Sequence, residues 1–166
     1  RDDKLWPEAD WIALGRRARA DGWRIALPQA GAAEAARAQR IAAALGSAAT
    51  VWPALELGAV IDRIATVQGA IGVDSGLSHI AVALGLPHVQ LYNFPTAWRT
   101  GPQIAHGHRD QVSVEGAPAP ALDAVWDAWQ QVRPADSAVA VDADEPQEAH
   151  EPGAAARTQP RPEHDR

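Results

Sequence analysis

The segment VDSGLSHIAVALG, residues 73–85, carries most of the information about the fold of this chain. It continues a short apolar run, Ala70–Val73, that is typical of a buried strand, and it runs on with the pattern of a helix. The Asp-Ser-Gly turn places N-cap residue types and free backbone N–H groups at the positive end of that helix. An anion, typically a phosphate, binds well at such a turn, and His79 lies one helical turn beyond Ser75.

Strand and helix patterns alternate on both sides of this segment. Helical patterns cover residues 8–20, 32–45, 55–67, 76–84 and 121–132, and strand patterns cover residues 23–27, 49–52, 70–73, 89–92 and 111–114. The alternation predicts an α/β fold in which a parallel sheet is covered by helices on both faces. Ligands of such sheets bind at the carboxyl ends of the strands, where Asp74 lies. The chain has neither a G-x-G-x-x-G fingerprint nor a Walker motif, which argues against classical dinucleotide and P-loop sites.

The composition is that of one ordinary globular domain with an acidic tail. The 166 residues are 46% hydrophobic and include no cysteine, so disulfides and thiolate metal sites are excluded. Most of the net charge of −6 belongs to residues 134–166, which carry eight acidic and three basic residues. Residues 1–133 are nearly neutral, and no clustered basic face indicates a nucleic-acid partner. No apolar run is long enough to span a membrane.

The two ends of the chain lead to separate expectations. Residues 134–166 are rich in Ala, Pro, Glu and Asp and contain few large apolar residues, so we expect a disordered tail after a folded domain of residues 1–133. The chain begins at Arg1 and contains no methionine, and we expect it to be the C-terminal part of a longer protein.

The ordered set of motifs resembles glycosyltransferase family 9, the bacterial lipopolysaccharide heptosyltransferases. The resemblance extends from RDDKLWPE, residues 1–8, to about Arg133, and it is strongest in the strand, Asp-Ser-Gly turn, histidine and Ala-rich helix of residues 70–84. The sequence is most similar to the heptosyltransferase I group. This resemblance implies a Rossmann-like fold that forms the C-terminal half of a GT-B glycosyltransferase.

The resemblance also implies a reaction. Its members transfer heptose from ADP-heptose to the Kdo of the lipid A inner core, with inversion at the anomeric carbon. The general base is an aspartate of an N-terminal domain that this sequence lacks, so no catalytic residue is expected here. We therefore expect an inverting heptosyltransferase fragment that binds nucleotide without turnover, at the cytoplasmic face of the inner membrane, as a peripheral protein.

Five candidate donor-binding residues lie near the Asp-Ser-Gly turn or at the start of the chain. Lys4 is the only lysine, and the resemblance implies that it contacts the donor phosphates; its alternative is a solvated loop residue. Asp74 is expected to cap the following helix and to face the sugar nucleotide. Ser75 and Gly76 are candidates for a phosphate cradle, the alternative being an ordinary tight turn. His79 is expected to meet the phosphates, although a lone histidine is often a packing residue.

Two further candidates lie earlier in the chain. The resemblance implies that Glu34 binds the ribose hydroxyls, which suits a carboxylate because it accepts two hydrogen bonds; its alternative is a favourable charge at a helix start. Leu55 matches a position that packs on adenine, but it could equally be a core residue. The sequence departs from the family at Gln29-Ala30, where Trp-Gly is usual.

The loop of residues 93–108 offers weaker candidates. Thr96 and Arg99 could reach the donor, and His106, His108 and Asp110 are too loosely spaced to predict a metal site. We therefore expect no metal and no cofactor, as in GT-B enzymes. Two other functions remain open: a non-catalytic nucleotide-binding module of the same fold, and an epimerase-like relative that binds a UDP-sugar.

Overall fold

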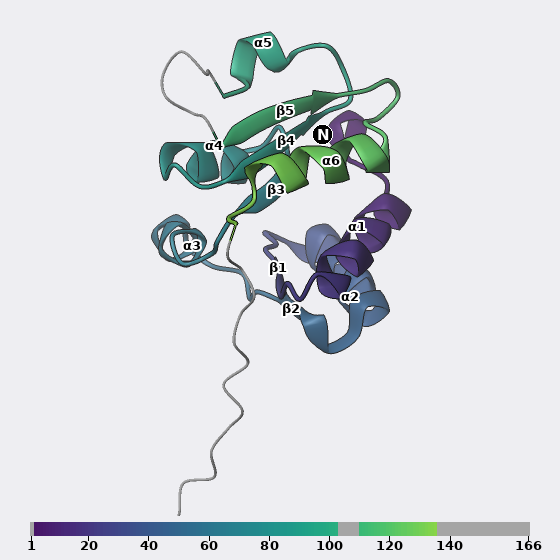
Figure 1. The fold of residues 1–166 in the computed structure, drawn as a ribbon. Coiled ribbons are helices and arrows are strands. Elements are labelled where there is room, and N and C mark those ends of the chain that lie inside the picture. The colour runs from purple at the N-terminus through teal and green to yellow at the C-terminus, as the bar shows by residue number, and fades with distance from the viewer. Residues whose placement is uncertain (1, 103–109, 136–166) are drawn as a thin grey trace, which may run out of the picture.

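The computed structural model describes residues 2–102 and 110–135. The expectations for His106, for His108 and for the tail beyond residue 135 lie outside these residues. Within them the chain forms an α/β fold in which every strand pairing is parallel. This confirms the predicted fold class (Figure 1). No helix of the described part is long and apolar enough to cross a membrane.

A three-stranded parallel sheet forms the centre of the molecule. Its strands are β3 (Ala70–Val73), β4 (His88–Tyr92) and β5 (Gln111–Glu115), in the order β3-β4-β5. Two helices pack against it, α4 (Gly76–Ala83) on β3 and β4, and α6 (Leu122–Val132) on β4 and β5 (Figure 1). All five residues of β4 are buried, as expected of the middle strand of a parallel sheet.

A second, two-stranded sheet pairs β1 (Ile25–Leu27) with β2 (Ala49–Val51). It packs with two long helices, α1 (Glu8–Ala20) and α2 (Ala32–Leu45). The remaining helices are η1 (Asp2–Lys4), η2 (Gly46–Ala48), α3 (Leu57–Ile64) and α5 (Ala97–Thr100). Helix α1 contacts both α2 and α6 and so connects the two sheets.

The expected single sheet is therefore divided in two. Among the described residues no hydrogen-bonded ladder joins β1 to β3, and the residues of both strands are only partly buried. Periodicity indicates which segments are strands, but pairing requires two backbones to come within about 5 Å. In this chain the two sheets are connected through helices, since α1 contacts β1 and α2 as well as α6.

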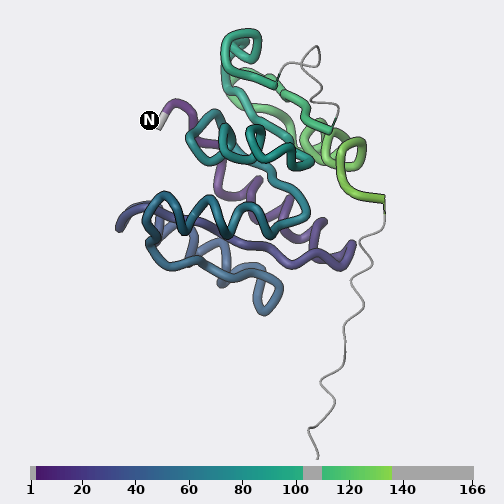
Figure 2. The backbone as a smooth tube through the Cα atoms, turned by 90° about the vertical axis from the view of Figure 1, so that its left-hand side faces the viewer, coloured from purple at the N-terminus to yellow at the C-terminus, as the bar shows by residue number. Residues whose placement is uncertain are grey.

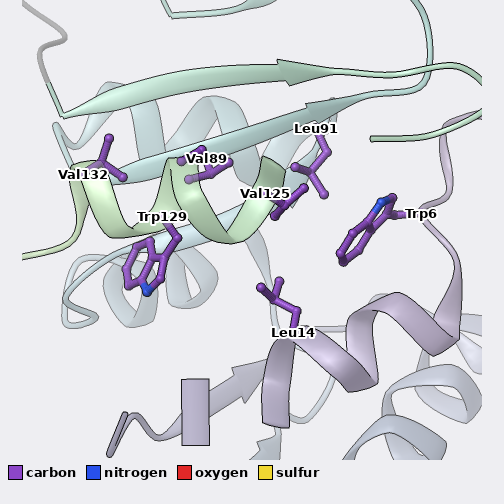
Figure 3. Close-up of a cluster of buried hydrophobic side chains, with 8 residues drawn as sticks. Trp6, Leu14, Val89, Leu91, Val125, Trp129 and Val132 are labelled. Carbon is purple, nitrogen blue, oxygen red and sulfur yellow. The ribbon is translucent and has the colours of Figure 1, made fainter. Parts of the chain in front are cut away.

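The main core lies under α6. Val125 and Trp129 of α6, Val89 and Leu91 of β4, Leu14 of α1 and Trp6 before it belong to one buried cluster (Figure 3). Trp23 packs edge-on against Trp129 with ring centroids 5.4 Å apart. The tryptophans of this cluster are packing residues.

Several element bounds differ slightly from the sequence-based expectation. Helix α3 begins at Leu57 rather than at Leu55, and β1 begins at Ile25 rather than at Trp23. The predicted loop after β4 contains the short helix α5, whose four residues are too few for a periodic pattern. In Figure 2 the purple N-terminal segment before α1 lies beside the teal part of the chain, which holds β3, α4 and β4.

Candidate functional site

The N-terminal segment is held over the carboxyl end of β4. The side-chain amide of Asn93 donates to the carbonyl oxygens of Asp3 at 2.9 Å and Leu5 at 3.1 Å. The indole N–H of Trp6, which is buried, donates to the carbonyl of Pro120 at 2.8 Å. These bonds fix the backbone on both sides of Lys4, so its side chain is directed to the end of β3.

Lys4 forms an ion pair with Asp74, the first residue after β3. The ammonium Nζ lies 2.6 Å from Oδ2 of Asp74 and 3.5 Å from its carbonyl oxygen. The Lys4 side chain is 37% exposed and that of Asp74 is 14% exposed. The alternative of a solvated loop residue does not describe this arrangement, because the lysine is paired with a carboxylate. Its contact with donor phosphates stays a prediction.

Three other polar groups surround the Asp74 carboxylate. Nε2 of His79 lies 3.5 Å from Oδ1, and the amide Nε2 of Gln90 lies 3.4 Å from the same oxygen. Thr100 also interacts favourably with the carboxylate. Burial alone would raise the pKa of Asp74, but the hydrogen bond and charge of Lys4, together with Thr100 and His79, lower it below its ordinary value. The carboxylate is therefore ionised at neutral pH.

Helix α4 starts directly beside this cluster. Ser75 is its N-cap residue, in an extended conformation, but no side chain forms a hydrogen bond to the cap. The predicted side-chain cap at this turn is therefore wrong, since Asp74 is engaged by Lys4 instead. Because the first N–H groups of a helix have no partner within it, the positive end of α4 stays available to a ligand.

The turn itself is open to solvent. Gly76 is exposed, and a Cβ built on it would meet nothing within 4 Å. Ser75 is half-buried, and His79 is 49% exposed on the first turn of α4. Lys4, Asp74, Ser75, Gly76 and His79 thus gather at one edge of the three-stranded sheet, as the sequence predicted for this motif.

Glu34 and Leu55 lie elsewhere, with the two-stranded sheet. Glu34 is exposed in the first turn of α2, where its Oε2 accepts a hydrogen bond from the N–H of Ala30 at 2.8 Å. Gln29, at the position where the sequence departs from the family pattern, bonds to the carbonyl of Trp52 through Nε2 at 3.2 Å. Leu55 is half-buried in the loop between β2 and α3. The local helix-start role of Glu34 is therefore present, and its binding role stays a prediction.

Sequence reasoning missed a polar layer on strand β4. His88, Gln90 and Tyr92 alternate with Val89 and Leu91, and all five are buried. The period-2 alternation of polar and apolar residues was the available signal, but it normally indicates a solvent-facing side rather than a buried one. Burial lowers the pKa of His88 to about 4, assisted by the charge of His79, so this imidazole is neutral at neutral pH.

Tyr92 and Thr100 link the short helix α5 to the site. The phenol oxygen of Tyr92 and Oγ1 of Thr100 are 3.1 Å apart. Either hydroxyl can be the donor of this bond. Burial, with the charges of Asp74 and Glu115, raises the pKa of Tyr92 and keeps it protonated.

A small pocket opens beside the ion pair. Its lining comes from the N-terminal segment, the end of β3, and the end of β4 with the loop after it: Lys4, Asp74, Leu91, Tyr92, Asn93, Phe94 and Thr96. Thr96 thus lines this pocket, and its contact with the donor stays a prediction. Arg99 instead lies over the ring of Trp98, 6.0 Å from its centroid. Within residues 2–102 and 110–135 no group of three or more His, Asp or Glu residues could hold a metal ion.

Comparison with known proteins identifies relatives of this chain. The family model of glycosyltransferase family 9 (heptosyltransferase) matches residues 1–121. Lipopolysaccharide heptosyltransferase 1 of Pseudomonas aeruginosa is 43% identical over 89 residues, which cover 54% of this chain and 25% of that protein. The enzyme of the same name from Salmonella typhimurium is 40% identical over 92 residues, covering 55% and 29%. The chain thus spans less than a third of the length of these curated relatives.

Two solved structures resemble the fold. E. coli heptosyltransferase WaaC with ADP matches at a TM-score of 0.67 and 28% identity, covering 76% of this chain and 39% of that one. WaaC with ADP-2-deoxy-2-fluoro heptose matches at a TM-score of 0.54 and 36% identity, covering 58% and 30%.

Proposed function

The chain belongs to glycosyltransferase family 9, the heptosyltransferases, and we propose that it is the part of a heptosyltransferase I that binds ADP-heptose. The observation that carries the proposal is the cluster of Lys4, Asp74 and His79 beside the open N-terminus of α4. A lysine, a histidine and free N–H groups suit a diphosphate, and a fixed carboxylate suits sugar hydroxyls. The two WaaC structures, with ADP and with an ADP-heptose analogue, support this choice of donor.

In this proposal the chain stabilises the leaving group of the transfer reaction. Transfer of heptose releases ADP, whose diphosphate gains negative charge as the glycosidic bond breaks. Lys4 and the N–H groups of the first turn of α4, with Ser75 and Gly76 lining the turn, would stabilise that charge. We expect no divalent ion to be needed, so EDTA should leave ADP binding unchanged.

The other half of the reaction would lie outside this sequence. An N-terminal half would supply the general base, bind the Kdo-lipid A acceptor and complete an inverting transfer. The enzyme would then work as a peripheral protein at the cytoplasmic face of the inner membrane, where its acceptor is a lipid. Glu34 and Leu55 would take the ribose and the adenine in the same proposal.

Calorimetric titration of the 166-residue chain with ADP, ADP-heptose and UDP tests the donor assignment. We expect the two adenine nucleotides to bind, UDP to bind much more weakly, and Asp74→Ala to weaken ADP-heptose binding about tenfold. The matched control is Asp21→Ala, which removes another ion-paired carboxylate, 2.9 Å from Arg133, and should leave binding unchanged.

Each other result has a distinct meaning. Preference for UDP would favour the epimerase-like relative, and ADP binding without discrimination for the sugar would favour a nucleotide-binding module. Heptose transfer by this chain alone would contradict the assignment of the base to another segment.

A further inference from the structure

Gln90 is a fully buried amide in the middle of the central strand. Its exposed fraction is 0%, and it lies between β3 and β5 in the sheet. Nε2 donates to Oδ1 of Asp74 over 3.4 Å, and Oε1 has no hydrogen-bond partner in the described part of the chain. A buried acceptor without a partner lowers the stability of a fold.

Stability alone does not explain an amide at this position. A residue such as methionine has a similar length and no unpaired acceptor. The contact that distinguishes Gln90 from an apolar residue is its donor bond to Asp74.

Gln111 on the adjacent strand provides the contrast. It is also buried, and its Oε1 also has no partner among the described residues. Its Nε2, however, donates to the carbonyl oxygens of Val82 at 3.1 Å and Leu86 at 3.2 Å, where α4 ends. Gln111 therefore has a structural role that Gln90 lacks.

The two oxygens of Asp74 are held from different sides. Lys4 binds Oδ2, whereas Oδ1 is approached by exposed His79 and by buried Gln90. A diphosphate that draws Lys4 toward itself removes the strongest partner of Asp74. The bond from the buried amide of Gln90 then remains.

We propose that Gln90 is a positioning residue of the donor site, whose amide keeps the Asp74 carboxylate directed at the sugar when Lys4 turns to the diphosphate. This inference rests on the proposed function, because it assigns Asp74 to the sugar nucleotide. The positioning lowers the stability of the fold, because Oε1 of Gln90 is buried without a partner among the described residues.

The test combines calorimetry with thermal unfolding on the full chain and four variants: Gln90→Met, Asp74→Ala, the double variant, and the control Gln111→Met. Gln90→Met should weaken ADP-heptose binding about five- to tenfold while Tm stays equal or rises. In the Asp74→Ala background the same change should weaken binding less than twofold, because the group that Gln90 positions is gone. Gln111→Met should lower Tm and change affinity less than twofold.

Different failures have different meanings. If the parent does not bind ADP-heptose, the proposed function fails and the role of Gln90 fails with it. If the parent binds but Gln90→Met weakens binding equally with and without Asp74, or leaves affinity unchanged, only the positioning role is overturned. A Gln90→Met chain that is clearly less stable than the parent would likewise assign Gln90 a structural role.

Discussion

The ammonium of Lys4 lies 2.6 Å from Oδ2 of Asp74, although seventy residues separate the two in the chain. The cation expected to receive a diphosphate is therefore already neutralised by a carboxylate in the free protein. Phosphate binding must compete with this pair, and the competition connects the opening segment of the chain to the end of β3. The pair thus opposes the diphosphate alone, whereas in the proposed function the contact of Asp74 with the sugar more than offsets this for ADP-heptose.

Replacing Lys4 should separate its effect on binding from its effect on stability. Lys4→Met should weaken ADP binding about tenfold, because the diphosphate loses a cation. The free energy of unfolding should fall by only about 1 kcal/mol, because the lysine is more than a third exposed and solvent screens its charge. Calorimetry and urea unfolding measure both quantities.

The control for that variant is Arg40→Met, which breaks the exposed ion pair of Arg40 with Glu8, 2.7 Å apart. It should leave ADP affinity unchanged. A Lys4→Met chain that binds ADP as tightly as the parent would show that Lys4 serves only Asp74.

His88 should make the fold sensitive to mild acid. Its pKa is about 4 in the folded chain and about 6.5 when unfolded, so below pH 6.5 the unfolded chain binds more protons. The stabilising effect of neutral His88 is fully present above pH 6.5 and is lost as the pH falls toward 4. The protein should be about 2 kcal/mol less stable at pH 5 than at pH 7 from this residue alone.

Urea unfolding of the parent and of His88→Leu at both pH values tests this expectation. The substitution should remove most of the difference between the two pH values, since leucine does not titrate. An equal loss of stability in both chains would assign the acid sensitivity to other groups.

Gly69 should tolerate no side chain. A Cβ at this position would lie 2.7 Å from the ring of Trp129 and 2.9 Å from the carbonyl oxygen of Pro87. Gly69→Ala should therefore lower the free energy of unfolding by about 1–3 kcal/mol. In Gly58→Ala, within α3, the new Cβ meets nothing within 4 Å, and this control should gain about 0.5–1 kcal/mol. If Gly58→Ala lost stability and Gly69→Ala did not, the expected steric contact at Gly69 would be wrong.

Glu34 should act on the ribose and only weakly on stability. Glu34→Gln keeps an oxygen that can accept from the N–H of Ala30, so Tm should change little. The affinity for ADP should fall several-fold. The affinity for 2′-deoxy-ADP should fall less, because this nucleotide lacks one of the two hydroxyls that Glu34 would bind. The matched control is Glu56→Gln, an exposed residue at the start of α3 that forms no side-chain cap bond. Equal losses for the two nucleotides would exclude contact with that hydroxyl.

Much of the architecture follows from local pattern. The bounds of α1, α2 and β3 match the predicted segments, because helical and strand periodicity are properties of short stretches of chain. The grouping of Asp74, Ser75 and His79 follows in the same way, since a strand, a turn and one helical turn bring them together. Helix α5 was missed because four residues are too few to show a period.

The sequence by itself therefore determined the strands, the helices and the turn at the end of β3, because backbone hydrogen bonds and apolar periodicity act over a few residues. Tertiary structure decided what that turn contacts. The pairing of Lys4 with Asp74, the burial of Gln90 beneath it and the division of the strands into two sheets all join segments far apart in the chain. These contacts depend on how α1 and α6 pack over the core, and no local pattern encodes that packing.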